Sequence, residues 1–206
     1  MQSLEETKTW IIKLYGNRLR KDGVTKVWLH SVAVERRLAN LADQLQLIGF
    51  DQSLISLEVR HAALLHDALE DAPKLFDHQG KQVGFDFRCY EILQSQIADR
   101  CSPEILELVQ NVTHPIQAER LQRYRALERR AQRTWQIPEC LIKTADHLDN
   151  RDERNADYWR IQHTYNMLRY LHNRLQRLDA LELFTLMLDL EGIPYEIEMS
   201  GDVSIG

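Results

Sequence analysis

Apolar residues recur at helical spacing along most of the chain. Over 28–46 they follow a 3.6-residue repeat that consists of Leu29, Val32, Val34, Leu38, Leu41 and Leu45. Ser3 and Glu6 have the spacing of a capping box, and we expect a first helix over 3–19. The segment 53–70 is apolar nearly all round, so it is predicted to form a central, buried helix.

Further helices are predicted after an interruption. Pro73 cannot continue the helix before it, and 73–88 is predicted to be an irregular surface loop, whose use as a lid stays open. The pattern then predicts helices over 89–98, 103–112, 117–134, 138–152 and 156–191, the last either continuous or broken. The fold class is therefore all-α, with one helical domain over 1–198 and a flexible C-terminal tail over 199–206.

Composition narrows the class of protein. Of the 206 residues, 44% are apolar and 28% are charged, with a formal charge of −5, which is typical of a globular protein. An acidic chain is not expected to coat nucleic acid, although a local basic pocket can still bind a phosphate substrate. The three cysteines lack C-x-x-C spacing, and neither a signal peptide nor an apolar run of about 18 residues is visible. We expect a cytoplasmic protein with no nucleic-acid or membrane partner.

A polar cluster interrupts the apolar segment 53–70. It contains His66, Asp67, Glu70 and Asp71. Burying these charges is costly unless they are paired or bind a metal. On a continuous helix, residues four apart lie side by side, so His66 would neighbour Glu70, and Asp67 would neighbour Asp71. The alternative is a capped or solvated helix end, which the apolar neighbours on both sides disfavour.

Two more segments carry candidate ligands. Lys143, Asp146 and Asn150 lie at helical spacing within 138–152, and His30 lies at the start of an apolar helix. With the first cluster they give a set of two histidines and two carboxylates: His30, His66, Asp67 and Asp146. Such a mixed nitrogen and oxygen set suits Mn²⁺, Fe²⁺ or Zn²⁺ and leaves coordination positions for water and substrate. The isolated histidines are expected to be structural or surface residues: His61, His114, His163 and His172.

The order His30, His66-Asp67, Asp146 resembles the H…HD…D signature of the HD-domain metal-dependent phosphohydrolases. More narrowly, His66 to Asp71 is similar to the HDxxED element of RelA/SpoT-type hydrolases of the alarmone (p)ppGpp. The resemblance extends over about 10–155. The segment 20–23 is similar to that family's RK-x-G loop, and 111–113 is similar to its GVTK segment. The segment 119–127 is similar to its arginine-rich helix, and 141–150 is similar to its LIKLADRLHN helix.

Several positions depart from this family's pattern. His147 and Asp149 stand where the family usually has Arg and His. Glu153 stands where it usually has Thr, and Ala126 where it usually has Lys. The metal-binding and water-activating positions are all present, so the departures concern the nucleotide contacts.

The resemblance implies an HD-type helical bundle and a division of roles. One divalent ion, Mn²⁺ in preference to Fe²⁺ or Zn²⁺, would be held by His30, His66, Asp67 and Asp146. Glu70 and Asp71 would orient or deprotonate a water and manage the leaving group's protons. The substrate contacts would come from Arg20, Lys21, Arg125, Lys143 and Asn150. The alternatives are that the Arg20-Lys21 pair is a solvated turn and that most arginines of 120–133 form a solvated face.

The resemblance also implies a reaction. It is the hydrolysis of the 3′-diphosphate of (p)ppGpp or a related alarmone, with release of pyrophosphate. One alternative is an HD-type nucleotidase or phosphodiesterase that acts on another nucleotide, and a second is a non-catalytic helical binding module. The expected partner is a small-molecule nucleotide, and the sequence leaves the oligomeric state open.

Overall fold

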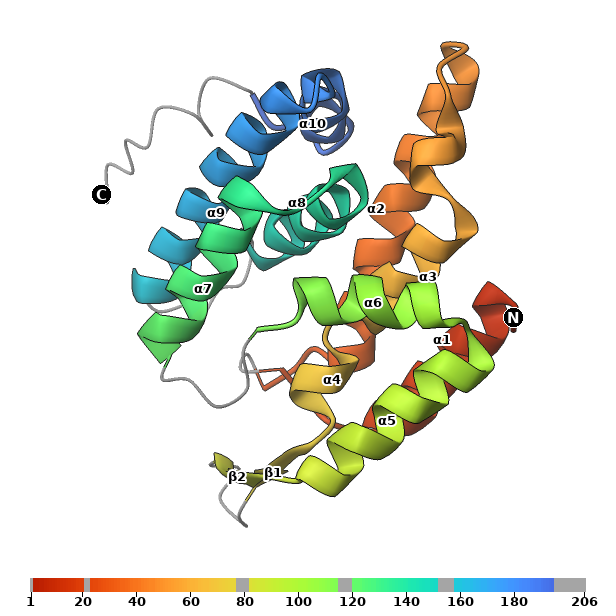
Figure 1. Ribbon diagram of the computed structural model, residues 1–206, viewed down its shortest axis with the longest axis vertical. Helices are drawn as coiled ribbons and strands as arrows, with labels where there is room; N and C mark the ends of the chain where they lie inside the picture. Colours follow the sequence, from red (N-terminus) through yellow and green to blue (C-terminus); the bar gives the residue numbers. More distant parts are fainter. Residues whose placement is uncertain (1, 21–22, 77–81, 115–119, 152–157, 195–206) are drawn as a thin grey trace.

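The computed structural model describes residues 2–20, 23–76, 82–114, 120–151 and 158–194. Helices make up nearly all of the regular structure in these ranges, so the predicted all-α class is confirmed (Figure 1). None of the described helices combines the length and the hydropathy needed to cross a bilayer. The predicted tail over 199–206 and the domain boundary at 198 lie outside the described residues.

The N-terminal half begins with two helices, and shorter elements follow them. The bounds are α1 Leu4–Tyr15, α2 Val27–Leu47, η1 Gln52–Ile55, α3 Leu57–Leu65 and α4 Ala68–Asp71. The capping box is present, because the Ser3 side chain accepts from the Glu6 amide and the Glu6 carboxylate accepts from the Ser3 amide. The first helix therefore starts where the sequence predicts, although it ends at Tyr15, before the predicted end at 19.

The second half of the chain consists of longer helices. The bounds are α5 Phe87–Arg100, α6 Pro103–Val112, α7 Arg120–Arg133, α8 Ile137–Arg151, α9 Tyr158–Arg177 and α10 Leu181–Leu190. Ser102 caps α6, and Pro103 takes its first position, where the missing amide hydrogen costs nothing. The predicted segment 156–191 is broken, since Asp179 and Ala180 leave the helical conformation between α9 and α10.

The core lies where α8 is enclosed by other helices. Helix α8 packs against α2 on one side and α9 on the other, while α3 packs against α2 and α6 (Figure 1). Nearly every side chain of α8 from Glu139 to Leu148 is buried, polar ones included. A helix so buried must pair its charged side chains, which makes α8 the natural place for a polar site.

The segment 53–70 is not the single helix that the pattern predicts. The 3₁₀ helix η1 and the helix α3 take its first part, and two turn residues, His66 and Asp67, separate α3 from α4. The His66 ring nitrogen Nδ1 donates to the carbonyl oxygen of Ala63 at 2.8 Å. In a continuous helix that oxygen would accept from the amide of Asp67. The side chain of His66 therefore takes part in breaking the helix, and the expected pair of polar ridges does not form.

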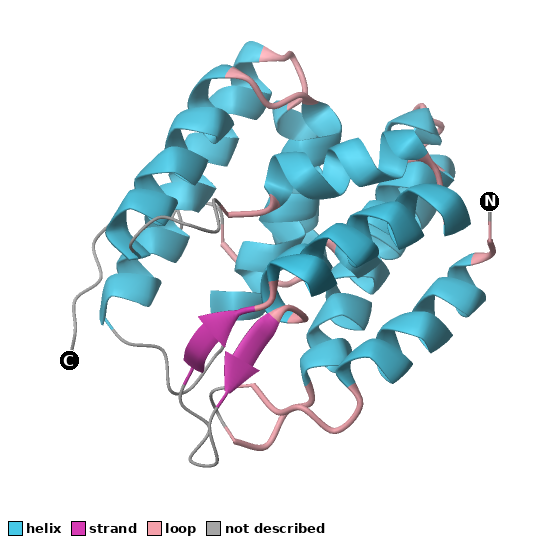
Figure 2. Ribbon diagram, turned by 60° about the horizontal axis from the view of Figure 1, so that its bottom comes forward, coloured by secondary structure: helices cyan, strands magenta, loops and turns pink. Residues whose placement is uncertain are grey.

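The segment 73–88 is more regular than predicted. Strands β1 (Lys74–Phe76) and β2 (Gln82–Phe85) pair in antiparallel fashion, and Lys74 lies opposite Phe85. Figure 2 shows the two strands side by side at the edge of the helical body. The strands are too short for a clear alternation of apolar and polar residues, which explains why the sequence did not reveal them.

Burial along α2 gives a test of the core. Leu45 is 1% exposed and Leu47 is 80% exposed, two residues further along the same helix. Leu45→Ala is expected to lower the free energy of unfolding by about 2–5 kcal/mol, because it removes buried methyl groups and leaves a cavity. Leu47→Ala should change it by less than about 0.5 kcal/mol. Equal losses for the two variants in urea unfolding would contradict this description of the core.

Candidate active site

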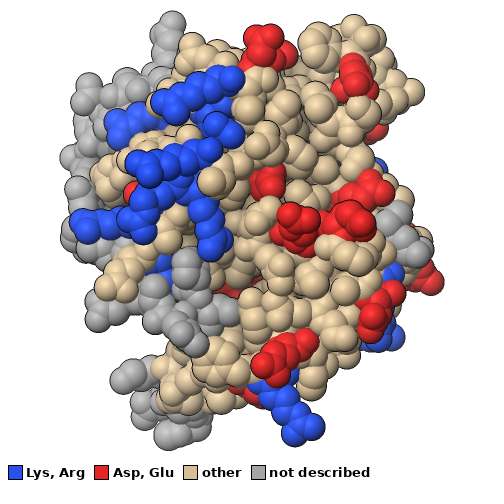
Figure 3. Space-filling view, in the orientation of Figure 1, with Lys and Arg blue, Asp and Glu red and all other residues tan. Residues whose placement is uncertain are grey.

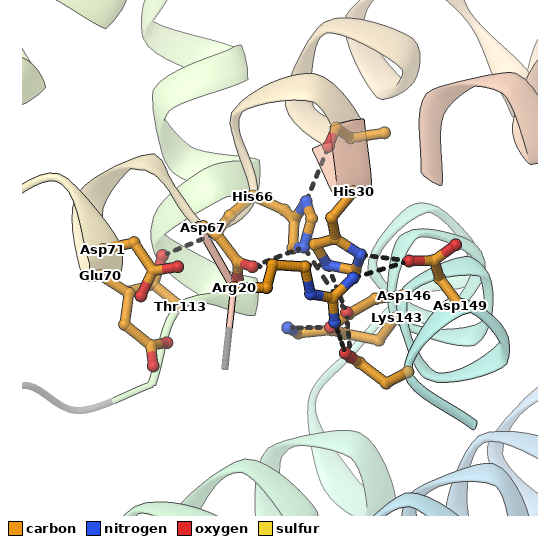
Figure 4. A network of polar contacts seen from close by, with 12 residues as sticks. Arg20, His30, His66, Asp67, Glu70, Asp71, Thr113, Lys143, Asp146 and Asp149 are labelled. Carbon is orange, nitrogen blue, oxygen red and sulfur yellow. Dashed lines mark hydrogen bonds and ion pairs between the residues drawn. The ribbon is translucent and has the colours of Figure 1, made fainter. Parts of the chain in front are cut away.

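Four side chains from three distant segments converge at one point of the core. His30 lies in the first turn of α2, His66 and Asp67 lie at the break between α3 and α4, and Asp146 lies on α8. Figure 4 shows the two imidazoles and the two carboxylates facing one another. The sequence-based ligand set is therefore brought together in space.

The distances place the Nε2 atom of each imidazole near both carboxylates. His30 Nε2 is 3.1 Å from Asp146 Oδ1 and 3.5 Å from Asp67 Oδ2. His66 Nε2 is 3.2 Å from Asp67 Oδ2 and 3.6 Å from Asp146 Oδ1. Both rings use Nδ1 elsewhere, so the same nitrogen, Nε2, faces the carboxylates in each case.

The Nδ1 contacts fix the orientation of the two rings. His30 Nδ1 donates to Asp149 Oδ2 at 2.6 Å, and His66 Nδ1 donates to the Ala63 carbonyl. With Nδ1 carrying the proton, the lone pair of a neutral imidazole lies on Nε2, as a metal ligand requires. Asp149 was not among the residues that sequence analysis selected for the site. The sequence did hint at Asp149, because it lies three residues after Asp146 at a position where the RelA/SpoT family usually has His.

The four groups stabilise one another's charged forms. Burial disfavours the imidazolium of His66, yet the charges of Asp67 and Asp146 raise its pKa to about 9. Burial also disfavours the Asp146 carboxylate, yet Lys143 and His66 hold its pKa well below the usual range. The site therefore concentrates negative charge where a divalent cation could replace the protons of the imidazoles.

The donor set fits a divalent metal ion. Ligand atoms of His30, His66 and Asp67 all lie within 4.8 Å of one another, and Asp146 Oδ1 lies beside both imidazoles. His66 Nε2 is buried and has no hydrogen-bond partner in the described part of the chain. A bare buried nitrogen is costly, and coordination to a metal would satisfy it.

A second group of polar residues holds Asp146 in place. Lys143 Nζ donates to Asp146 Oδ2 at 2.6 Å, and Asn150 Nδ2 donates to Asp146 Oδ1 at 2.6 Å. Arg20 donates to Asn150 Oδ1 at 2.7 Å and to Asp149 Oδ2 at 3.0 Å. Three of the predicted substrate-binding residues, Arg20, Lys143 and Asn150, therefore lie at the site, and they also support its carboxylates.

The two predicted acid–base residues lie on α4, beside the carboxylates and imidazoles. Glu70 Oε2 accepts from the amide of His114 at 3.4 Å, and Glu70 Oε1 lies 3.7 Å from Lys74 Nζ. Asp71 also pairs with Lys74. Burial raises the pKa of the Asp71 carboxyl, with Lys74 opposing the shift and the charge of Asp67 adding to it. The two carboxyl groups thus have different environments, which can separate acid from base.

These residues line one cavity of about 530 Å³. Cavities of this size hold ligands as large as a nucleotide. Acidic side chains line its floor, and basic ones surround them: Arg18, Arg20, Lys74, Arg123 and Lys143. Phe76 and Gln82 of the hairpin line another part of the wall. The cavity therefore offers a cation site, positive charge for phosphates and an aromatic ring in one space.

Two histidines that sequence analysis expected to be structural or surface residues line this cavity. His114 and His163 both belong to its wall, a position that the sequence did not indicate. Each stands alone in the sequence, and only folding brings the two rings to 5.9 Å between centroids. His61 and His172 fit the expectation, because His61 Nδ1 is 3.0 Å from the Thr7 hydroxyl oxygen and His172 packs edge-on to Phe184.

The predicted contacts from the arginine-rich helix are placed differently. Arg125, Arg129 and Arg133 are exposed, and Arg125 does not line the cavity. Arg123 lines it instead, and Arg130 points inward to the carbonyls of Asn111 and Thr113. Figure 3 shows basic side chains gathered over α7 and α9, as expected of a solvated face. Lys21 lies outside the described residues.

A solved structure resembles this fold. It is that of a metazoan orthologue of SpoT, which hydrolyses ppGpp and plays a role in starvation responses. The TM-score is 0.60, the sequence identity is 19%, and the match covers 94% of this chain and 99% of that chain. At this identity the likeness concerns the fold. No curated protein matches the sequence.

Residues 27–151 match the HD domain family. This span runs from the start of α2 to the end of α8 and takes up more than half of the 206 residues. It includes the four converging residues, His30, His66, Asp67 and Asp146, and HD domains bind divalent metal ions. The chain belongs to the HD domain family, and it is a metal-dependent phosphohydrolase.

Proposed function

We propose that this protein hydrolyses the 3′-diphosphate of (p)ppGpp or a related alarmone and releases pyrophosphate. The observation that carries the proposal is the placement of Glu70 and Asp71 in the same cavity as the two-histidine, two-carboxylate cluster. The similarity in fold to a metazoan SpoT orthologue that hydrolyses ppGpp supports it. The basic wall suits a substrate with several phosphates.

The metal ion would be held by His30, His66, Asp67 and Asp146. We propose Mn²⁺, while Fe²⁺ and Zn²⁺ also suit a mixed set of imidazoles and carboxylates. When bound, such an ion lowers the pKa of a coordinated water and polarises a phosphoryl oxygen. Asp149 would then act through His30, because its hydrogen bond to Nδ1 orients the ring and increases its basicity.

The chain's own carboxylates would move the protons. Glu70 is proposed to take a proton from the attacking water, because it lines the cavity and is not among the four ligands. Asp71, whose pKa is raised by burial, is proposed to supply a proton to the ribose oxygen that leaves. Lys74 lies next to both carboxylates and fixes their positions. The water loses a proton and the leaving oxygen gains one, so the step balances.

The nucleotide contacts would come from the residues around the metal-binding set. Arg20 and Lys143 can donate to phosphate oxygens, and Asn150 can donate to or accept from ribose. Phe76 of the hairpin presents an aromatic ring on which a base can stack. The proposed partner is a small-molecule nucleotide. We place the protein in the cytoplasm, where the free thiols of Cys89, Cys101 and Cys140 would stay reduced.

The substrate assignment is tested with three nucleotides and Mn²⁺. We expect release of pyrophosphate from ppGpp and no comparable hydrolysis of a deoxynucleoside monophosphate or a cyclic dinucleotide. The products are to be separated by ion-exchange chromatography. Preferred hydrolysis of either other nucleotide would assign the protein to HD-type nucleotidases or phosphodiesterases. Stoichiometric metal binding with no turnover on any of them would favour a binding module.

The ligand set is tested by replacing Asp146. Asp146→Ala should abolish both retention of the metal and hydrolysis, because it removes a carboxylate oxygen that lies beside both imidazoles. Asp146→Asn keeps the shape and an acceptor for Lys143, so it serves as the variant less prone to unfolding. Metal content is to be measured by mass spectrometry after gel filtration. Retained metal in folded Asp146→Ala would show that the ligand set is wrong, whereas Asp146→Asn, whose amide oxygen can still coordinate, should bind the metal more weakly.

The role of Glu70 is tested separately from metal binding. Glu70→Gln should keep the metal and lower kcat by about 10²- to 10⁴-fold, the usual contribution of a general acid or base. Glu107, an exposed residue of α6, provides the control as Glu107→Gln. Unchanged turnover in Glu70→Gln would remove this residue from the mechanism, and loss of metal would indicate that it helps to hold the ion.

A further inference from the structure

Four basic or imidazole side chains form a second polar wall of the cavity. His114 follows α6, Arg123 lies on α7, His147 on α8 and His163 on α9, and all four line the cavity. His147 and His163 are only 4% and 6% exposed. We call these four residues the imidazole wall. None of them belongs to the cluster formed by His30, His66, Asp67 and Asp146.

The rings of the imidazole wall pack together closely. His163 lies edge-on to His147, with 5.5 Å between ring centroids. The ring of His163 also stacks in parallel on that of Tyr124, with 3.9 Å between ring centroids. Its Nδ1 atom is 3.2 Å from Glu128 Oε1. The positions of the rings are therefore fixed by packing and by one carboxylate, as in a preformed binding site.

Five buried nitrogen atoms of this wall make no hydrogen bond within the described residues. The atoms without a hydrogen-bond partner in the described part of the chain are His114 Nδ1, Arg123 Nε, His147 Nδ1, His147 Nε2 and His163 Nε2. All of them are buried polar atoms, and such atoms are nearly always satisfied in folded proteins. Their concentration on one wall of one cavity indicates that a ligand with several polar atoms satisfies them.

The arrangement does not suit a second metal ion. Among the described residues, the group whose ligand atoms all lie within 4.8 Å is His30, His66 and Asp67, and the wall's imidazoles do not form another. The wall also carries the permanent positive charge of Arg123. Burial lowers the pKa of His114 well below its usual value, and the charge of Lys143 adds to that shift. A positive wall of N–H donors favours an anion.

We propose that His114, Arg123 and His147, positioned by His163, bind a second phosphoryl group of the substrate, distinct from the one that is hydrolysed. This inference rests on the proposed nucleotide hydrolysis and defines the substrate class: a nucleotide with two separate phosphoryl groups. Arg123 Nε–H donates to one phosphoryl oxygen, and His114 and His147 can each donate an N–H to another. His163, whose Nδ1 contacts Glu128, acts as a positioning residue, because its ring packs edge-on against His147. His147 stands where the RelA/SpoT family usually has Arg, so this part of the proposed phosphate site is particular to this chain's sequence.

The wall is tested first with inorganic phosphate and metal-free protein. Isothermal titration calorimetry after treatment with a chelator should show phosphate binding, because the donors belong to the chain. Arg123→Gln should weaken the affinity by about tenfold or more, as expected for the loss of a hydrogen bond to a charged group. Arg129→Gln, an exposed position of the same helix, is the matched control and should bind phosphate as the unmodified protein does.

A second variant separates binding from folding. His147→Phe keeps an aromatic ring in the same place but removes two unpartnered nitrogens, so phosphate affinity should fall while the melting temperature stays level or rises. A fall in both would mean that His147 acts in the structure and would contradict the proposal. So would unmeasurable phosphate binding by the unmodified protein, or equal affinities of Arg123→Gln and Arg129→Gln.

Kinetics then distinguish a substrate phosphoryl group from free phosphate as an effector. Phosphate should inhibit hydrolysis of ppGpp competitively, and Arg123→Gln should raise KM for ppGpp but leave KM for guanosine 3′-diphosphate unchanged. Non-competitive inhibition, or an equal rise in KM for both nucleotides, would overturn the assignment to a second phosphoryl group. If no nucleotide is hydrolysed, the proposed function fails, while the phosphate titration still decides whether the wall binds an anion.

Discussion

The structure depends on a balance of charge at the meeting point of α2, the α3–α4 break and α8. Two carboxylates, the partly buried Asp67 and the buried Asp146, face the Nε2 atoms of two buried imidazoles at 3.1–3.6 Å. Neither pair of groups could be buried alone, because an unpaired charge in the core is too costly. Together they are stable, and they form the donor set that a divalent cation requires. The same interaction therefore joins three segments of the fold and prepares its chemistry.

Helix α8 is the element through which most of the site is connected. Lys143 and Asn150 hold the two oxygens of Asp146, and Asp149 holds His30. Arg37 of α2 extends the network, because it donates to Asp149 at 2.7 Å and to Glu191, just beyond α10, at 3.0 Å. A shift of α8 would thus change the distances from its carboxylates to both imidazoles at once. Preorganisation of this kind keeps a site ready for its ligand and substrate.

The cavity has two walls of different character around this centre. The hairpin contributes Phe76 and Gln82, while His114, Arg123, His147 and His163 form the imidazole wall. An aromatic ring suits a base, and a positive group of donors suits phosphate. The span that matches the HD domain family, 27–151, includes the four converging residues, whereas His163 and the helix α9 that carries it lie beyond that span. Under the proposed function, these two walls would bind the base and the second phosphoryl group of the substrate.

The sequence by itself determined the all-α class and most helix positions, because helical periodicity is a local signal. It also offered His30, His66, Asp67 and Asp146 as candidate ligands, because buried charge is costly, and the resemblance to the HD-domain phosphohydrolases assigned them to one metal ion. It could not show that His66 breaks its helix or that 73–88 contains a hairpin, since both depend on hydrogen bonds that compete with local preference. Only the tertiary structure brought Asp149 to His30 and gathered His114, Arg123, His147 and His163 on one wall. Each of these residues is unremarkable among its neighbours in sequence, and its role arises from contacts between segments far apart in the chain, which no local pattern encodes.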